Sequence, residues 1–300
     1  MSVESKLQDW YLRYGFILDM RSTGKQKEKF IRPLLTDLKS IQMEPKTDQF
    51  RLSDKGAEYT NIYVGTIENA KQIICTYYDT PSLHLGGYRF FDKDKNRKNT
   101  LIVTFLLAIV WLILGILLTV FIAIPLFETY GVADIRTIGL VLIFFVYFFL
   151  LNKFARGMTK RKNIVRNSSS ILSMLDFMEN NRKRKINQVA YAFLDSGVTN
   201  EQGLEHLKDI SSGKILHLDA VGSENDLYLV GVNERALSRY PNSQRVKKVT
   251  NDAVLDERVS HLISAQNEEH LYLSKDEVNS KNLNSKNLAI VSTYLKQTVG

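Results

Sequence analysis

The 300-residue sequence contains one cysteine, Cys75, and lacks several motifs that often accompany catalysis. A single cysteine excludes a disulfide framework, and its place inside an apolar segment agrees with a reducing compartment. The sequence shows no glycine-rich phosphate loop and no Gly-x-Ser-x-Gly nucleophile elbow. No charged n-region with a short apolar core and cleavage site opens the chain, so we expect no secretory signal peptide.

The sequence also lacks the interleaved aromatic and basic residues that bind single-stranded nucleic acid. The net charge is nevertheless +8. Much of the excess lies beside two long apolar stretches, where each Lys or Arg near an anionic lipid surface gains about 1 kcal/mol. We therefore expect anionic lipid headgroups, and no nucleic acid, among the partners.

The two apolar stretches predict a transmembrane hairpin over residues 100–152. Residues 101–127 contain no charged side chain, and about 20 such residues suffice to span the hydrocarbon core. Residues 137–151 form a shorter uninterrupted stretch, which the preceding residues extend to a second span at about 133–152. A buried helix of a soluble protein is the alternative for this second segment.

The charged flanks of the hairpin predict its orientation. Residues 88–99 and 152–166 are basic, whereas the link between the spans carries a single Arg. By the positive-inside rule, the basic flanks lie in the cytoplasm. We expect a cell-membrane protein with two spans, with both termini and the main domain cytoplasmic. Residues 1–99 and 153–300 would then be the two parts of that domain.

Apolar strands alternate with amphipathic helices outside the hairpin. We expect strands at 61–67, 71–78, 186–195, 213–223 and 226–232, and helices at 2–20, 25–43, 167–181, 201–210 and 283–299. This alternation predicts an α/β fold with a mostly parallel mixed sheet flanked by helices. Sites in such folds lie beyond the carboxyl ends of the strands. The hairpin leaves the domain after such an end, so we expect the site to face the membrane.

Three segments, 61–80, 167–195 and 213–230, resemble in order and spacing the bacterial di-zinc aminopeptidases. The resemblance covers most of the soluble sequence. It implies their α/β fold, which nicastrin-like and transferrin-receptor-like domains without peptidase activity share. In active members it implies two zinc ions held by His and carboxylate ligands, with a separate Glu as general base.

Carried over position by position, the resemblance implies a degenerate site. The His and Asp that end the first strand match Tyr77 and Asp79, the bridging Asp matches Arg166, and a later Asp ligand matches Asp219. The paired Glu residues fall at Ser196, Gly197 and Val198, and the last His at Leu273 or Ser274. A guanidinium at the bridge would repel dications, because Arg stays charged. The vestigial site would thus contain Tyr77, Asp79, Arg166, Gly197, Val198, Asp219 and Leu273 and bind no metal, with both Asp residues free to pair with Arg166.

A displaced metal site is the alternative. His217 and Asp219 point to the same face of a strand, so His217 could bind a single zinc ion with Asp219 and with Asp79 or Glu201. A hydrogen-bonded structural histidine is the simpler reading of His217, and we expect His261 to be a surface or packing residue.

These observations predict a membrane-anchored, catalytically inactive peptidase-like protein without a cofactor. We expect it to act as a binding or accessory subunit of a membrane protein complex, such as a transporter or a peptide-processing complex, with peptide as a further partner. The first alternative is an active membrane-bound metallo-aminopeptidase with displaced zinc ligands. The second is a structural module that recruits partners through its basic juxtamembrane surface.

Overall fold

The computed structural model describes residues 3–51, 56–81, 83, 86–131, 134–155, 160–161, 163–182, 188–198 and 200–299. The chain forms two compact units. The larger unit comprises residues 1–81, 86–93 and 161–300, and the smaller one comprises residues 82–85 and 94–160.

A mixed sheet forms the centre of the larger unit. Its strands are β1 (Pro45–Arg51), β2 (Glu58–Val64), β3 (Gln72–Tyr77), β4 (Tyr88–Arg89), β5 (Val189–Leu194), β6 (Lys214–Asp219), β7 (Asp226–Gly231), β8 (Val246–Thr250), β9 (Val259–Asn267) and β10 (Leu271–Leu273). The hydrogen-bonded order is β1-β2-β5-β3-β6-β9-β10-β4, and β7 joins β9 and β8. Strands β5, β3, β6 and β9 are mutually parallel. The predicted α/β fold with a mixed sheet is therefore confirmed, and the parallel part is its centre, because the pairings β1–β2, β2–β5, β7–β9, β9–β10 and β10–β4 are antiparallel.

The central strands are apolar because both of their faces are covered, as is usual for parallel strands. In β3, Ile73 and Cys75 belong to one core cluster and Ile74 to the other. In the parallel register, Cys75 lies opposite Ala192 of β5 and His217 of β6. Cys75 is thus a buried core residue, and its strand delivers Tyr77 and the residues after it to the carboxyl edge of the sheet.

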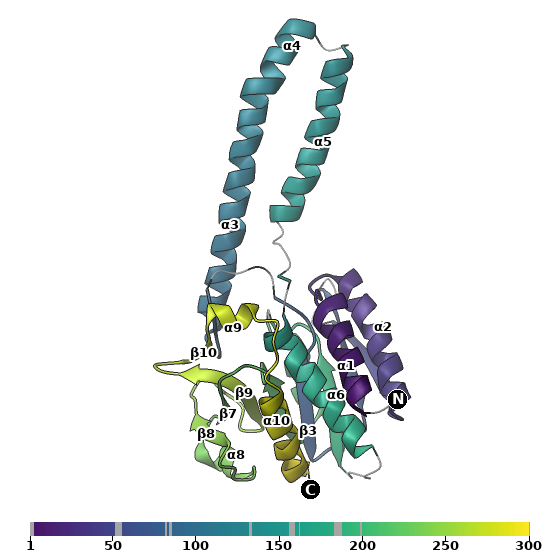
Figure 1. Cartoon of the computed structure of the whole chain (residues 1–300), viewed down its shortest axis with the longest axis vertical. Helices are drawn as coiled ribbons and strands as arrows, with labels where there is room; N and C mark the ends of the chain where they lie inside the picture. The colour runs from purple at the N-terminus through teal and green to yellow at the C-terminus, as the bar shows by residue number, and fades with distance from the viewer. Residues whose placement is uncertain are drawn as a thin grey trace. The chain divides into compact units, whose positions relative to one another are not determined.

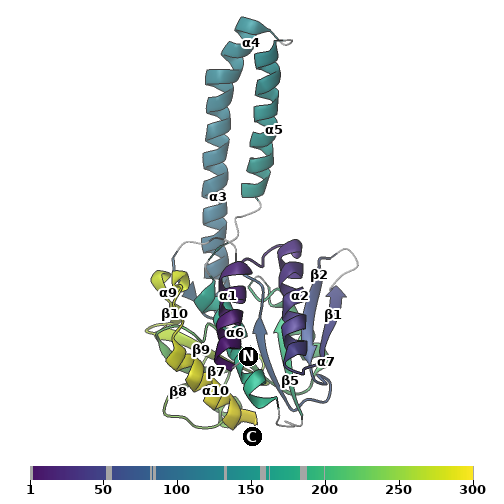
Figure 2. The same cartoon turned by 45° about the vertical axis from the view of Figure 1, so that its right-hand side comes forward.

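Helices cover both faces of this sheet (Figure 1). The larger core cluster packs beneath α1 (Val3–Leu12), α2 (Gly24–Ser40), α6 (Ser169–Asn181) and α10 (Ser285–Val299). On the opposite face lies α7 (Gln202–Ile210), whose Leu204 and Leu207 join the second cluster. The short helices are α8 (Glu234–Ser238) and α9 (Lys275–Asn279), and single π-helical turns form η1 (Arg13–Ile17) and η3 (Ile164–Ser168). Figure 2 shows α1 and α2 together in front of the sheet.

The smaller unit is a pair of apolar helices. One continuous helical run, Lys93–Tyr130, contains α3 (Lys93–Leu118), η2 (Thr119–Ala123) and α4 (Ile124–Tyr130), and α5 spans Ile135–Ala155. By length and composition, both helices could cross a membrane.

Within this pair, the helices approach closely at Gly115. The Tyr147 hydroxyl donates to the Trp111 carbonyl at 2.7 Å, and a Cβ on Gly115 would lie 2.3 Å from that hydroxyl. Small residues at helix crossings are typical of membrane helix pairs.

We predict that Ile74→Ala lowers the free energy of unfolding of the larger unit by about 2–5 kcal/mol, because it leaves a cavity in a fully buried layer. Urea unfolding in detergent, followed by near-ultraviolet circular dichroism, measures the loss. The exposed neighbour Lys71 provides the control, and Lys71→Ala should change stability by no more than about 0.5 kcal/mol. Equal effects of the two substitutions would contradict the assigned packing.

Candidate functional site

A cavity of about 40 Å³ lies at the carboxyl edge of the parallel strands. Most of the sequence-predicted positions line it, namely Tyr77, Arg166, Gly197, Val198, Glu201, His217 and Asp219. The sequence analysis missed other lining residues, among them Tyr88, Phe90, Phe91, Asn167 and His261. A cavity of this size can hold a few water molecules and is far smaller than a peptide. Its walls come from segments that are widely separated in the sequence.

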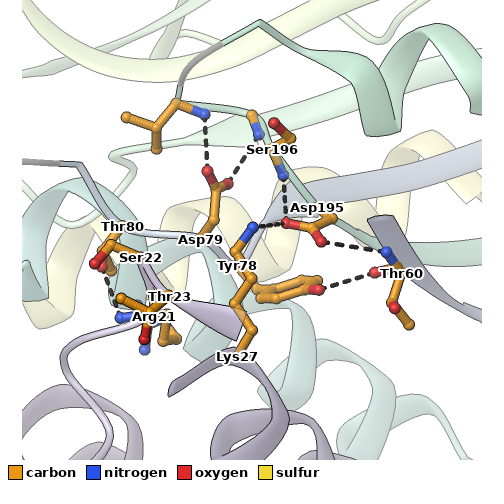
Figure 3. Close-up of polar contacts among 12 residues, drawn as sticks. Arg21, Ser22, Thr23, Lys27, Thr60, Tyr78, Asp79, Thr80, Asp195 and Ser196 are labelled. Carbon is orange, nitrogen blue, oxygen red and sulfur yellow. Dashed lines mark hydrogen bonds and ion pairs between the residues drawn. The ribbon is translucent and has the colours of Figure 1, made fainter. Parts of the chain in front are cut away.

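Asp79 lies directly after β3 and holds a neighbouring loop instead of lining the cavity (Figure 3). Its carboxylate accepts hydrogen bonds from the backbone N–H groups of Gly197, at 2.8 Å, and Val198, at 3.3 Å. Its carbonyl accepts a hydrogen bond from Asn167 Nδ2 at 2.7 Å. Burial raises the pKa of Asp79 to about 6, although Lys27 and the two N–H donors act to lower it. Asp79 therefore ties β3 to the loop after β5 and to η3.

Asp195 is a second buried carboxylate in this network, and the sequence analysis did not identify it. It follows β5 and accepts hydrogen bonds from Lys27 Nζ at 2.5 Å, from the Ser196 N–H at 2.6 Å and from the Thr60 N–H at 3.2 Å (Figure 3). Lys27 belongs to α2, so this contact joins the N-terminal helices to the loop at residues 195–198. Asp195 thus links β2 and the end of β5 to α2.

Tyr77 fills the position that the resemblance assigns to a zinc-binding His. Its ring packs against the backbone of Gly197 so closely that a Cβ on Gly197 would lie 1.7 Å from the ring. The same ring contacts His217, with 4.3 Å between the ring centroids. A Glu side chain at position 197 and a Tyr at position 77 are therefore mutually exclusive in this geometry.

Arg166 does not form the predicted ion pairs. Within the described residues, no carboxylate oxygen of Asp79 or Asp219 lies within ion-pair distance of its guanidinium. The guanidinium lies over the Tyr88 ring instead, 3.6 Å from its centroid, where the aromatic face offers a cation–π contact. The ring of Tyr88 thus replaces the expected carboxylate as the main partner of the buried cation.

Asp219 lines the cavity and carries a raised pKa. The pKa of Asp219 is raised to about 7, mainly by burial; the charge of Arg166 acts to lower it, and the negative charges of Glu201 and Asp79 act to raise it. Glu201 is itself paired with Lys93 Nζ at 2.6 Å. The cavity thus holds a carboxyl group that is protonated over a wide pH range.

His217 pairs with His261, which lines the cavity and was expected to be a surface or packing residue. Their Nδ1 atoms lie 3.1 Å apart, and burial lowers the pKa of both imidazoles. Both rings are therefore neutral, with one donating its Nδ1–H to the other. His217 Nε2 is buried without a hydrogen-bond partner among the described residues.

Leu273 lies away from the cavity. It ends β10 and is fully buried in a core cluster with Phe90 and Val278. The neighbouring Ser274 caps α9 in a reciprocal arrangement with Glu277. The segment that the resemblance aligned with the last His ligand therefore has a structural role.

The fold implies zinc, and the residues present do not fit it. The carboxylate of Asp79 is directed at backbone donors, Glu201 is paired with Lys93, and His217 has one nitrogen engaged by His261. Within the described residues, no group of three or more His, Cys, Asp or Glu side chains could hold a metal ion. The alternative set of Asp79, Glu201, His217 and Asp219 is therefore not assembled as a metal site.

Comparisons with solved structures support the fold. Tannerella forsythia glutaminyl cyclase matches with a TM-score of 0.57 and 9% identity, covering 99% of this chain and 97% of that one. A Zn-dependent exopeptidase from Parabacteroides distasonis matches with a TM-score of 0.53 and 12% identity over 100% of this chain and 97% of that one. A leucine aminopeptidase precursor from Bacteroides thetaiotaomicron matches with a TM-score of 0.56 and 11% identity, covering 99% of this chain and 96% of that one. The resemblance to di-zinc aminopeptidases is thus confirmed as a shared fold. No family model and no curated protein matches the sequence.

We predict that Gly197→Ala lowers the free energy of unfolding by about 1–3 kcal/mol, because its Cβ must displace the Tyr77 ring. Gly24→Ala is the matched control, since nothing lies within 4 Å of a Cβ built there. A double-mutant cycle with Tyr77→Ala measures the contact directly. If Gly197→Ala lowered the free energy of unfolding equally in the Tyr77→Ala background, the proposed contact between the Tyr77 ring and Gly197 would be wrong.

We predict a pH-dependent gain in stability from Asp219→Asn. The folded-state pKa of about 7 lies above the ordinary value of 3.8, so the folded state retains a proton that the unfolded state loses. The contribution of Asp219 to stability therefore falls as pH rises from about 4 to 7 and is constant above that. Relative to the wild type, the free energy of unfolding of the variant should increase by up to about 4 kcal/mol between pH 4 and pH 7.

Urea unfolding at a series of pH values measures this difference between variant and wild type. The lowered pKa values of His217 and His261 act in the opposite direction, because they reduce stability as pH falls below about 6.5. Both proteins contain these histidines, so subtracting the wild-type free energy from that of the variant removes their contribution. The exposed Asp252 serves as control through Asp252→Asn. A stability difference for Asp219→Asn that does not change with pH would contradict the burial of a protonated carboxyl group.

Proposed function

We propose that this protein is a catalytically inactive, peptidase-like binding subunit anchored in the cell membrane. The observation that carries the proposal is the packing of Tyr77 against Gly197. One ring occupies the space of a metal ligand and also requires the absence of the side chain at the general-base position. Zinc-dependent catalysis would thus be lost through two substitutions, Tyr at position 77 and Gly at position 197, that fit each other sterically.

The charge distribution of the cavity supports the same proposal. Arg166 places a permanent cation where the related enzymes would bridge two metal ions, and the ring of Tyr88 shields it. Asp219 has a pKa of about 7, so it carries a full negative charge only well above that pH. Neither group provides the negatively charged ligands that divalent metal ions need.

The apolar helices of the smaller unit support a membrane protein as the partner. The two apolar helices expose large side chains along most of their length, and the chain beside them is basic. We propose that they span the cell membrane, with both termini and the larger unit in the cytoplasm. Their faces would pack against another membrane protein, such as a transporter or a peptide-processing complex, and the basic flanks would bind anionic lipid headgroups.

Metal content and activity test the inactive site. Protein purified from cells grown with added zinc should contain substoichiometric zinc by mass spectrometry, because the donor set is not assembled. Aminoacyl p-nitroanilides should not be hydrolysed, and peptides with an N-terminal Gln should not be cyclised, above the background of an Asp79→Ala, Asp219→Ala double variant. Stoichiometric zinc that this double variant loses would instead support the active metallo-aminopeptidase.

The proposed partner is tested separately, by crosslinking the full chain in native membranes before detergent is added. The control carries an unrelated two-span hairpin in place of residues 100–152 and keeps the larger unit. Recovery of one membrane protein with the native chain and its loss with the control would support packing through the spans. Equal recovery with both would show that the partner binds the larger unit.

A further inference from the structure

An exposed apolar patch lies on the first helical segment of the larger unit. Leu12, Phe16 and Ile17 have exposed fractions of 51%, 41% and 74%. Leu12 and Phe16 are four residues apart and so share a helical face, and Ile17 follows Phe16 at the end of the π-helical turn η1. The opposite face of this run carries Trp10 and Tyr14, which are buried in the core. The patch is therefore held on a fixed element and is not a frayed end.

The patch borders the point where the chain returns from the smaller unit. Turn η1 packs against η3, where a Cβ on Gly15 would lie 3.6 Å from Ile164. Asn163 Nδ2 also donates to the Asp19 carbonyl at 3.3 Å. Only residues 156–163 separate η3 from the end of α5, and a segment of that length reaches at most about 30 Å. In the proposed membrane arrangement, the segment that joins α5 to η3 is therefore a short one.

The composition of the returning segment identifies lipid as the surface that covers the patch. Residues 153–162 contain five Lys or Arg residues and no Asp or Glu. Lys160 is buried, whereas Lys153 and Arg161 are exposed. Exposed apolar side chains together with nearby cations are the combination by which helices bind the interface of an anionic bilayer.

We propose that Leu12, Phe16 and Ile17 insert into the headgroup–acyl interface of an anionic bilayer. They give the larger unit a contact with the membrane in addition to its two covalent connections to the spans. This contact restricts rotation of the larger unit about the two segments that join it to the spans. The inference rests on the membrane location proposed above and is independent of whether the site is catalytic.

Fluorescence quenching in vesicles of phosphatidylcholine and phosphatidylglycerol tests this contact. The full chain carries Phe16→Cys or Ile17→Cys labelled with an environment-sensitive NBD dye, and the native Cys75 is buried and inaccessible to the dye. The control is Leu255→Cys, an 89% exposed leucine. It precedes β9 and so lies at the amino edge of the parallel strands, opposite the patch. Lipid carrying a shallow doxyl group should quench the patch labels at least about twofold more than the control.

The outcomes separate this proposal from membrane anchoring. If the labelled proteins failed to float with the vesicles, the proposed spans would be wrong. If they floated and the patch labels were quenched no more than the Leu255→Cys label, only the lipid contact would be overturned. Patch labels that are shielded from iodide in native membranes, yet not quenched by doxyl lipid, would show that a protein covers the patch, which also overturns it.

Discussion

The contact between the Tyr77 ring and the backbone of Gly197 determines what this site can be. It brings the end of β3 and the loop after β5 into van der Waals contact. Close-packed interiors do not accommodate an added side chain without movement of their neighbours. A larger side chain at position 197 is therefore incompatible with the Tyr77 ring in its present place.

Two buried carboxylates connect the segments at the strand ends. Asp79 and Asp195 both direct their oxygens at backbone N–H groups of residues 196–198. Buried N–H groups need partners, and their loss is costly. Lys27 of α2 supplies a positive charge that pairs with Asp195. These groups join three segments of the chain at the strand ends, so removing either carboxylate would leave buried N–H groups without a partner.

The strand and helix pattern was largely predictable from the sequence. Strands β3, β5, β6 and β7 and helices α6, α7 and α10 lie within the predicted segments, and β2 overlaps its predicted segment but begins earlier, at Glu58. Each of them carries a continuous apolar run or a clear helical stripe. Strand β9 is not among the predicted strands, because Ser260, His261 and Ser264 interrupt its apolar run. It nevertheless lies beside β6 in the centre of the sheet. Its serines and histidine are tolerated there because partners such as His217 and Ser223 come from other segments.

The sequence by itself determined the α/β pattern, the two apolar helices and which side chains stand at the positions compared with zinc ligands. Those properties depend on periodicity, composition and side-chain chemistry, which are local. Only the tertiary structure decided that Tyr77 closes on Gly197, that Arg166 stacks on Tyr88 and that His261 meets His217. Each of these contacts joins segments that are distant in the chain, and their distances follow from sheet order and register, which no local pattern encodes.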